Sequence, residues 1–254
     1  MNQHYTLSWL QNKFDRGETP ELLFFWGHKN NQNQHVGRFC FSQWFELPFI
    51  VDDVAYPTAE HWMMANKALL FGNQNIFDKI IKATKPGEVK ELGRQVLGFD
   101  ETIWNNYKYE IVKQGNIHKF NQHPKLASYL IQTGDKILVE ASPTDIIWGI
   151  GLSQDDTKAN DPHQWRGSNL LGFVLMEVRD FLHSFGHFEY IKSTNALPWK
   201  INSDIDPRDF FWQMGHGEEI IANFNTYYNN LTDRDKLIFK LSNPAPYNWR
   251  DLYN

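Results

Sequence analysis

Cysteine is almost absent from this chain: among 254 residues, only Cys40 is a cysteine. A lone cysteine excludes an internal disulfide framework and any metal site built from several thiolates. Long apolar runs are missing too, so no transmembrane helix is expected. The first residues, Met-Asn-Gln-His-Tyr, lack the basic and apolar regions of a secretion signal. These absences predict a soluble, cytoplasmic protein.

An excess of positive charge is also missing. The formal net charge is −5, which argues against a protein held on nucleic acid by a broadly basic surface, although a local basic groove is compatible with that sum. The ten histidines form no metal-binding pattern: Glu60-His61 lacks the His-Glu-x-x-His order, and His118 with His123 has no third ligand nearby. We therefore expect no metal and no cofactor.

Aromatic residues are plentiful, at 15% of the chain with ten tryptophans. They fill cores more often than they bind ligands, and the length fits one large domain with a substantial extension. Apolar patterning predicts strands at residues 22–26, 39–41, 45–51, 54–56 and 136–141, with Asp52-Asp53 as a turn. It predicts helices at residues 57–71, 76–83, 88–96, from 101 with an interruption at Gly115-Asn116, 124–133, 170–183, 218–228 and 233–241. A helical α+β protein with a small, mainly antiparallel sheet follows.

The segment 57–68 places a carboxylate and an amine seven residues apart in an otherwise apolar stretch. Seven residues make almost two helical turns, so Glu60 and Lys67 share one face with Met63 and Met64 between them. Ionisable groups on an apolar stripe cost stability unless they are paired or used, which makes this helix a candidate wall of an active site. The alternative is structural: Glu60 complements the helix dipole, and Lys67 extends along its stem to water.

The segment 141–151 follows a predicted strand and carries Asp145 and Trp148 three residues apart. Gly149 and Gly151 allow the backbone to approach a ligand closely. Two glycines without the following helix-and-acid pattern exclude a dinucleotide-binding fingerprint. Asp145 is interpreted either as a catalytic carboxylate or as an ordinary turn residue.

The segment 165–172 leads directly into a strongly periodic helix. A helix start with free N–H groups, beside Arg166 and Gly167, is a candidate phosphate cradle. Simple capping by Ser168 or Asn169 needs no ligand and is the alternative.

Together and in this order, these motifs resemble the NADAR family, also called the YbiA-like or riboflavin biosynthesis intermediates N-glycosidase family. The matching landmarks run over residues 22–183. They are Phe25-Trp-Gly27, Phe41-Ser-Gln-Trp44, Tyr56-Pro-Thr-Ala-Glu60-His with Lys67-Ala, Gly93-Arg94, Trp104, Lys119-Phe120, Thr133-Gly134, Val139-Glu140 through Gly151, Trp165 through Gly172, and Leu175-Met-Glu-Val-Arg179. The resemblance implies a predominantly helical, YbiA-like single domain at 22–183. A lead segment at 1–21 and a C-terminal helical extension of unknown role at 184–254 flank it.

The resemblance further implies cleavage of an N-glycosidic bond between a phosphorylated ribose or ADP-ribose and a base or amine. The substrates are riboflavin-pathway intermediates, or ADP-ribosyl-guanine in DNA or RNA, and no membrane partner is implied. The implied catalytic residues are Glu60, Lys67 and Asp145. The implied substrate-binding residues are Gly27, Ser42, Trp44, His61, Trp104, Trp148, Gly149, Gly151, Trp165, Arg166, Gly167 and Asn169.

Cleaving a C–N glycosidic bond builds cationic character at the anomeric carbon, so a nearby carboxylate is needed. One of Glu60 and Asp145 would stabilise this cation and orient water while the other transfers a proton, or Lys67 would attack and form a Schiff base. Trp104 and Trp148 are the candidates for stacking on the base. Many family members carry Asn where this chain has Gln43-Trp44, a departure that bears on which sugar or base fits.

Two other function classes remain open from the sequence. A non-catalytic ADP-ribose or NAD-type nucleotide-binding module would use the same aromatics and phosphate cradle without needing Glu60, Lys67 and Asp145 together. A structural partner protein would act through the aromatic residues of the C-terminal extension.

Overall fold

The computed structural model describes residues 4–29, 36–193 and 197–253. Its α-helices are α1 (Leu7–Asp15), α2 (Ala59–Leu70), α3 (Gln74–Lys82), α4 (Pro86–Arg94), α5 (Glu101–Gln122), α6 (Pro124–Ile131), α7 (Leu170–Phe185), α8 (Pro198–Ile201), α9 (Gly215–Asn229) and α10 (Asp233–Ser242). Its strands are β1 (Leu22–Phe25), β2 (Phe49–Val51), β3 (Val54–Tyr56) and β4 (Ile137–Glu140). Within the described ranges, no helix has the length and hydrophobicity needed to cross a bilayer. The predicted helical α+β class is confirmed.

The strands form two separate pairs. β2 and β3 make an antiparallel hairpin whose turn is the predicted Asp52-Asp53, both at positive φ. β1 and β4 pair in parallel, with Phe25 opposite Glu140. Both of these strands read as continuous apolar runs, which is typical of parallel strands covered on two faces. Residues far apart in the chain thus end at the same edge, and that edge positions the site described below.

The predicted strand at residues 39–41 is wrong. Arg38–Phe41 forms a 3₁₀ turn, and Cys40 and Phe41 are fully buried in the main core. A short apolar run does not distinguish a strand from a buried helical turn. Among the described residues, the segment joins neither of the two strand pairs.

The predicted interruption at Gly115-Asn116 is also wrong, because α5 runs unbroken from Glu101 to Gln122. Gly115 is instead a close-packing position: a Cβ there would lie 2.3 Å from Cδ1 of Trp62 on α2. Asn116 donates from Nδ2 to the Val112 carbonyl one turn earlier, at 2.8 Å. Tertiary packing therefore explains the residues that the sequence alone suggests are a break.

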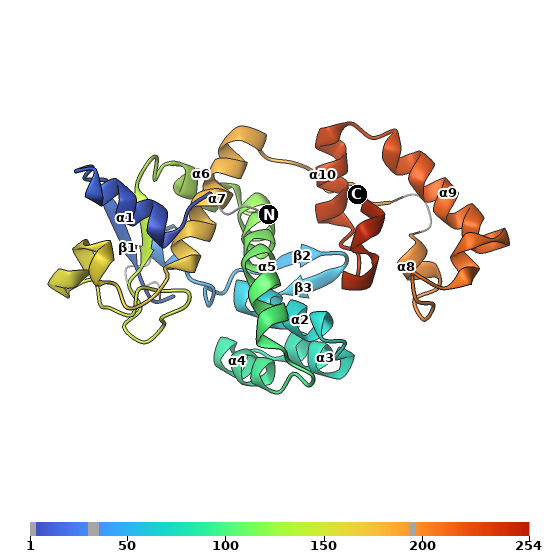
Figure 1. The fold of residues 1–254 in the computed structure, drawn as a ribbon, viewed down its shortest axis with the longest axis horizontal. Coiled ribbons are helices and arrows are strands. Elements are labelled where there is room, and N and C mark those ends of the chain that lie inside the picture. Colours follow the sequence, from blue (N-terminus) through green and yellow to red (C-terminus); the bar gives the residue numbers. More distant parts are fainter. Residues whose placement is uncertain (1–3, 30–35, 194–196, 254) are drawn as a thin grey trace.

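The C-terminal extension has a hydrophobic core of its own, built largely from aromatic side chains. Its buried members are Leu197, Trp199, Trp212, Ile220, Phe224, Tyr228, Phe239, Ala245, Trp249 and Tyr253. α10 joins the two parts, since Ile238 and Leu241 belong to the main core while Phe239 belongs to the second. Figure 1 shows α8 and α9 at one end of the molecule and α1 with β1 at the other.

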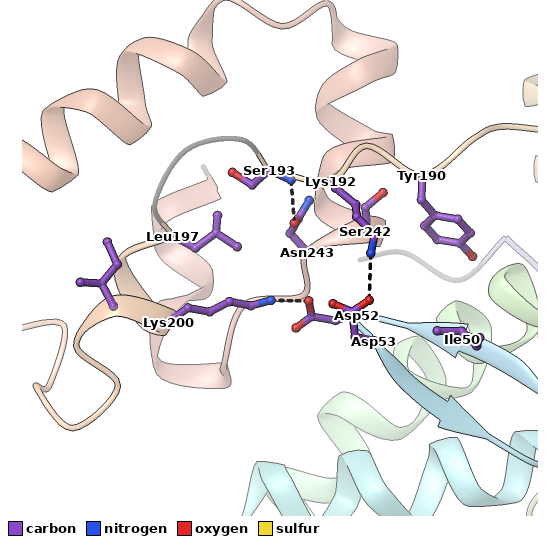
Figure 2. Close-up of a pocket in the computed structure, with 11 residues that line it drawn as sticks. Ile50, Asp52, Asp53, Tyr190, Lys192, Ser193, Leu197, Lys200, Ser242 and Asn243 are labelled. Carbon is purple, nitrogen blue, oxygen red and sulfur yellow. Dashed lines mark hydrogen bonds and ion pairs between the residues drawn. The ribbon is translucent and has the colours of Figure 1, made fainter.

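The extension also meets the β2–β3 hairpin across a cavity of about 570 Å³ (Figure 2). Lys200 pairs with Asp52, and Lys192 pairs with Asp53 at 2.9 Å. Lys192 and Asp53 are largely exposed, so that pair contributes little to stability in water. The apolar contacts of α10, rather than these ion pairs, hold the extension on the main core.

Candidate active site

The carboxyl ends of β1 and β4 open onto a cavity of about 590 Å³. Because the two strands are parallel, the residues that follow Phe25 and those that follow Val139 reach the same place. The 3₁₀ segment and α4 close the other sides. The cavity is lined by Trp26, Gly27, His28, Lys29, Ser42, Trp44, Lys90, Glu140, Ser142, Thr144 and Asp145.

Glu60 lies in the first turn of α2, two residues after the N-cap Thr58, and is only 4% exposed. Burial raises the pKa of this carboxyl to about 7, whereas the Lys90 ammonium and a hydrogen bond from Trp44 favour its charged form. Asp145 opposes ionisation through like charge. Glu60 is therefore coupled to three residues that line the cavity, and it titrates near neutral pH.

Glu140 is the last residue of β4 and lines the same cavity. Burial raises its pKa to about 8, and the negative charges of Asp145 and Glu60 act in the same direction. Its Oε2 atom is buried and has no hydrogen-bond partner in the part of the chain that the structure describes. The site thus holds a buried carboxyl that the sequence interpretation did not select.

Asp145 performs the turn function that the sequence left open, and it also faces the cavity. Its Oδ1 accepts hydrogen bonds from the backbone N–H groups of Ile147, at 2.9 Å, and Trp148, at 2.8 Å. Ser142 Oγ in turn accepts from the Asp145 N–H at 3.2 Å. These bonds hold the carboxylate in one orientation at the cavity wall.

The predicted phosphate cradle at the start of α7 is not available, because its N–H groups are already used. The N–H groups of Arg166 and Gly167 both donate to the Ile150 carbonyl, and that of Ser168 donates to the Ile146 carbonyl. The following N–H groups, of residues 169–171, donate to carbonyls of residues 147–149. The loop after β4 therefore satisfies the helix start that we expected to bind phosphate.

The Asn169 side chain binds the backbone of β4 and does not cap α7. Asn169 lies in the left-handed region at φ 52° and makes no side-chain cap hydrogen bond. Its Oδ1 accepts from the Glu140 N–H and its Nδ2 donates to the Leu138 carbonyl, both at 2.9 Å. This buried side chain fixes the end of β4, and with it the position of Glu140.

The glycines of this region allow close backbone packing. A Cβ on Gly167 would lie 2.3 Å from the Gly149 carbonyl oxygen, and one on Gly149 would lie 2.8 Å from the Glu140 carbonyl oxygen. Gly151 has a φ of +67°, which favours glycine. At Gly149 and Gly167 the nearest atoms belong to protein backbone, so these two glycines allow the loop to pack closely on itself.

Lys67 lies on the α2 helix as predicted but is not part of the cavity lining. Its Nζ donates to the Gly93 carbonyl at 2.8 Å and lies 4.2 Å from the centre of the Phe99 ring. The Trp104 ring lies 5.7 Å from the same Nζ. Burial lowers the pKa of this amine, and no carboxylate contributes to the shift. Lys67 is thus not the counter-charge of Glu60 within the described residues.

His61 and Trp165 make internal contacts. The Nε2 of His61 donates to the Ala83 carbonyl while Nδ1 is 2.8 Å from the Thr58 hydroxyl, and the residue is fully buried. The Trp165 indole N–H donates to the Ala159 carbonyl at 2.8 Å. Trp148 is partly buried against the main core. None of these three side chains lines the cavity.

Lys119 does not line the cavity but holds a segment that does. It is completely buried, and its Nζ donates to the carbonyls of Cys40 and Ser42. Ser42 and Trp44 lie on the segment that these bonds hold, and both line the cavity. Burial lowers the pKa of Lys119 to about 8. The buried Lys119 amine therefore fixes the position of the segment that forms one wall of the cavity.

The structure brings only part of the predicted site together. Of the predicted residues, Gly27, Ser42, Trp44 and Asp145 line the cavity, and Glu60 is electrostatically coupled to it. Trp26 and Glu140 belong to the landmark motifs, and an acidic residue at the end of the apolar run 137–139 was the available sequence signal for Glu140. Lys90, on a surface helix, has no local sequence signal.

Comparison with known proteins agrees with this architecture. The sequence model described as the NADAR domain matches residues 24–183. The chain belongs to the NADAR family. The matched range begins inside β1, includes β4 and the helices α2 to α6, and ends inside the last turn of α7.

Relatives of this NADAR chain include proteins named N-glycosidases. N-glycosidase R617 of Acanthamoeba polyphaga mimivirus is 45% identical over 168 residues, which cover 64% of this chain and 97% of that protein. N-glycosidase YbiA of Escherichia coli strain K12 is 29% identical over 142 residues, covering 56% of this chain and 80% of that protein. The solution structure of E. coli YbiA matches with a TM-score of 0.53 at 23% identity, covering 68% of this chain and 93% of that one. This last likeness supports the fold.

Proposed function

We propose that this protein is an N-glycosidase that hydrolyses the bond between a phosphorylated ribose or ADP-ribose and a base or amine. The observation that carries the proposal is Asp145 in the wall of the cavity, with the buried Glu60 hydrogen-bonded to Trp44, which lines the same cavity. Oriented negative charge stabilises the cation that forms at the anomeric carbon. Relatives named N-glycosidases support the same reaction class.

The two carboxylates take different roles in this proposal. Asp145, held by two backbone N–H groups, supplies fixed negative charge beside the anomeric carbon. Glu60, with its pKa raised to about 7, accepts a proton from the attacking nucleophile. Lys29 and Lys90 line the cavity and supply the cationic groups for substrate phosphate, in place of the α7 start.

The substrate is tested by product release. The purified chain is incubated with a phosphorylated pyrimidine intermediate of the riboflavin pathway and, separately, with DNA carrying ADP-ribosyl-guanosine. We expect one of them to release a free base or amine together with a reducing sugar, detected by mass spectrometry. Tight binding of both without release would instead identify a non-catalytic nucleotide-binding module.

Lys67 is the candidate nucleophile among the side chains. The Lys67 amine has a pKa lowered by burial, lies against Phe99 and is held by a single carbonyl. A larger neutral fraction makes it a better nucleophile. If it swings from Gly93 to the anomeric carbon it forms a Schiff base with the opened sugar. Borohydride added during turnover is then expected to leave a sugar adduct on Lys67, located by peptide mass spectrometry.

Lys79 provides the matched control for trapping, because it is a helical lysine outside the cavity lining. Lys79→Arg should leave the adduct unchanged, whereas Lys67→Arg should abolish it. Product accumulation without any adduct on Lys67 would exclude the covalent route and assign the attack to water.

A further inference from the structure

We propose that Glu140 is a further catalytic residue of this cavity, the carboxylic acid that delivers a proton to the departing base or amine. The inference rests on the proposed N-glycosidase function and assigns it a proton donor. Glu140 follows directly on a buried strand, so its backbone position is fixed by the sheet rather than by a mobile loop. It lines the same cavity as Asp145 and Trp44.

Three contacts hold the Glu140 backbone. Its N–H donates to Asn169 Oδ1 at 2.9 Å, and its carbonyl accepts from the Ile150 N–H, also at 2.9 Å. The third is made one residue later, where the Ala141 N–H donates to the Phe25 carbonyl at 2.9 Å. A group that transfers a proton must be held within hydrogen-bond reach of its partner, and this clamp provides such precision.

The Glu140 side chain has an unused hydrogen-bonding atom. Oε2 is buried and has no partner among the residues that the structure describes. Buried polar atoms are nearly always paired, so an orphan atom in a cavity wall calls for an explanation. A carboxylic O–H that waits for a substrate nitrogen supplies one, because the bound substrate would complete the missing hydrogen bond.

The charges that face Glu140 favour its protonated form. Asp145, from the loop after β4, and Glu60, from α2, both raise its pKa, while Lys90 from α4 lowers it. His28 and Lys29, after β1, line the same cavity. With burial as the largest effect, the pKa of Glu140 reaches about 8, so most molecules carry the proton at neutral pH.

Cleavage of the glycosidic bond moves one proton from Glu140 and one proton to Glu60. The C–N bond breaks and its electron pair goes to the leaving nitrogen, which takes the proton from Glu140. The nucleophile, water or the Lys67 amine, forms the new bond at the anomeric carbon and releases a proton to Glu60. Solvent then returns a proton to Glu140 and removes one from Glu60. When the Lys67 adduct is hydrolysed, the net reaction is the addition of one water across the C–N bond.

The test compares Glu140→Gln with the wild type on two leaving groups. On an N-glycoside that the wild type hydrolyses, we expect kcat to fall about 10²- to 10³-fold. On 4-nitrophenyl riboside 5-phosphate, whose phenolate leaves without a proton, we expect a loss of less than about threefold. The alkaline limb of the pH profile, near the Glu140 pKa of about 8, should disappear. Glu21→Gln, at the opposite end of the same strand pair, is the matched control and should resemble the wild type.

Two results would overturn the assignment. One is an unchanged kcat of Glu140→Gln on the N-glycoside; the other is an equal loss on both leaving groups with the alkaline limb retained, which indicates a structural role. Infrared difference spectra across neutral to alkaline pH add a readout that needs no turnover. The protonated-carboxyl signal that titrates near pH 8 in the wild type should be missing from Glu140→Gln, while the Glu60 signal near pH 7 remains, and unaltered spectra would also refute the proposal. A wild type that releases nothing from any N-glycoside refutes the proposed function itself, and this is seen before any variant is made.

Discussion

Glu60→Gln is expected to lower kcat about 10²- to 10⁴-fold, the range for loss of a general acid or base. Glutamine keeps the shape of the buried side chain and can still accept a hydrogen bond from Trp44, but it cannot take up a proton. Because Glu60 must be ionised to accept one, wild-type kcat/KM should rise with pH through its pKa of about 7, and the variant should lose this acidic limb. Steady-state kinetics across pH provide the measurement.

Glu110→Gln is the matched control for this variant. Burial raises the pKa of Glu110 as well, but its charged and hydrogen-bonding neighbours are Lys113, Gln114, Glu177 and Arg250, none of which lines the cavity. Its kcat should remain within about twofold of the wild type, since it touches no reacting atom. Normal turnover of Glu60→Gln, with circular dichroism and the urea midpoint unchanged, would show that Glu60 has no part in the chemistry.

The raised pKa of Glu60 also makes the free energy of unfolding depend on pH. The pKa of Glu60 is raised from 4.5 in the unfolded reference to about 7 in the fold. The folded state therefore retains a proton that the unfolded state releases, so the stabilising contribution is complete below about pH 4.5 and is lost as pH rises through about 7. Glu60→Gln should flatten the decline in unfolding free energy over this window.

Gly172→Ala is expected to destabilise the fold by at least about 3 kcal/mol, beyond the usual cost of overpacking. A Cβ at this position would lie 2.0 Å from the Leu138 carbonyl oxygen and 2.6 Å from both side-chain polar atoms of Asn169. The obstacle is backbone, so α7 would have to move away from β4. Alanine is intrinsically the better helix former by roughly 1 kcal/mol, and steric contact outweighs that gain. Urea denaturation gives the difference.

Gly87→Ala is the matched control, because Gly87 also lies in the first turn of a helix, α4, and a Cβ there meets nothing within 4 Å. This variant should gain up to about 1 kcal/mol. A Gly172→Ala protein as stable as the wild type would mean that α7 and β4 do not pack as closely as the structure shows. Activity should also fall in Gly172→Ala, since β4 carries Glu140 into the cavity.

Local sequence signals predicted most helices well. The predicted helix at 233–241 is observed as α10, and it begins with a local cap in which Thr232 Oγ accepts from the Asp235 N–H at 3.1 Å. The Asp52-Asp53 turn is observed too. Such features depend on residues a few positions apart, so the residue types in the sequence are enough to predict them.

The sequence interpretation was wrong, or made no prediction, where a feature depends on residues far apart in the chain. Gly115 looks like a helix break until the Trp62 ring is placed against it. The start of α7 looks like a free anion site until the carbonyls of the 146–150 loop are seen to occupy it. In both cases a local motif was correctly recognised as unusual, and only its partner, from another part of the chain, explains it.

The sequence by itself determined the helical α+β class and the kinship with the NADAR family, and it predicted Glu60 and Asp145 as candidate catalytic carboxylates. The tertiary structure decided which groups meet. The parallel pairing of β1 with β4 brings Trp26 to Glu140 across more than a hundred residues, and burial there shifts a carboxyl pKa to about 8. Desolvation and the field of neighbouring charges are properties of three-dimensional surroundings, so no pattern along the chain could have revealed that Glu140 holds its proton.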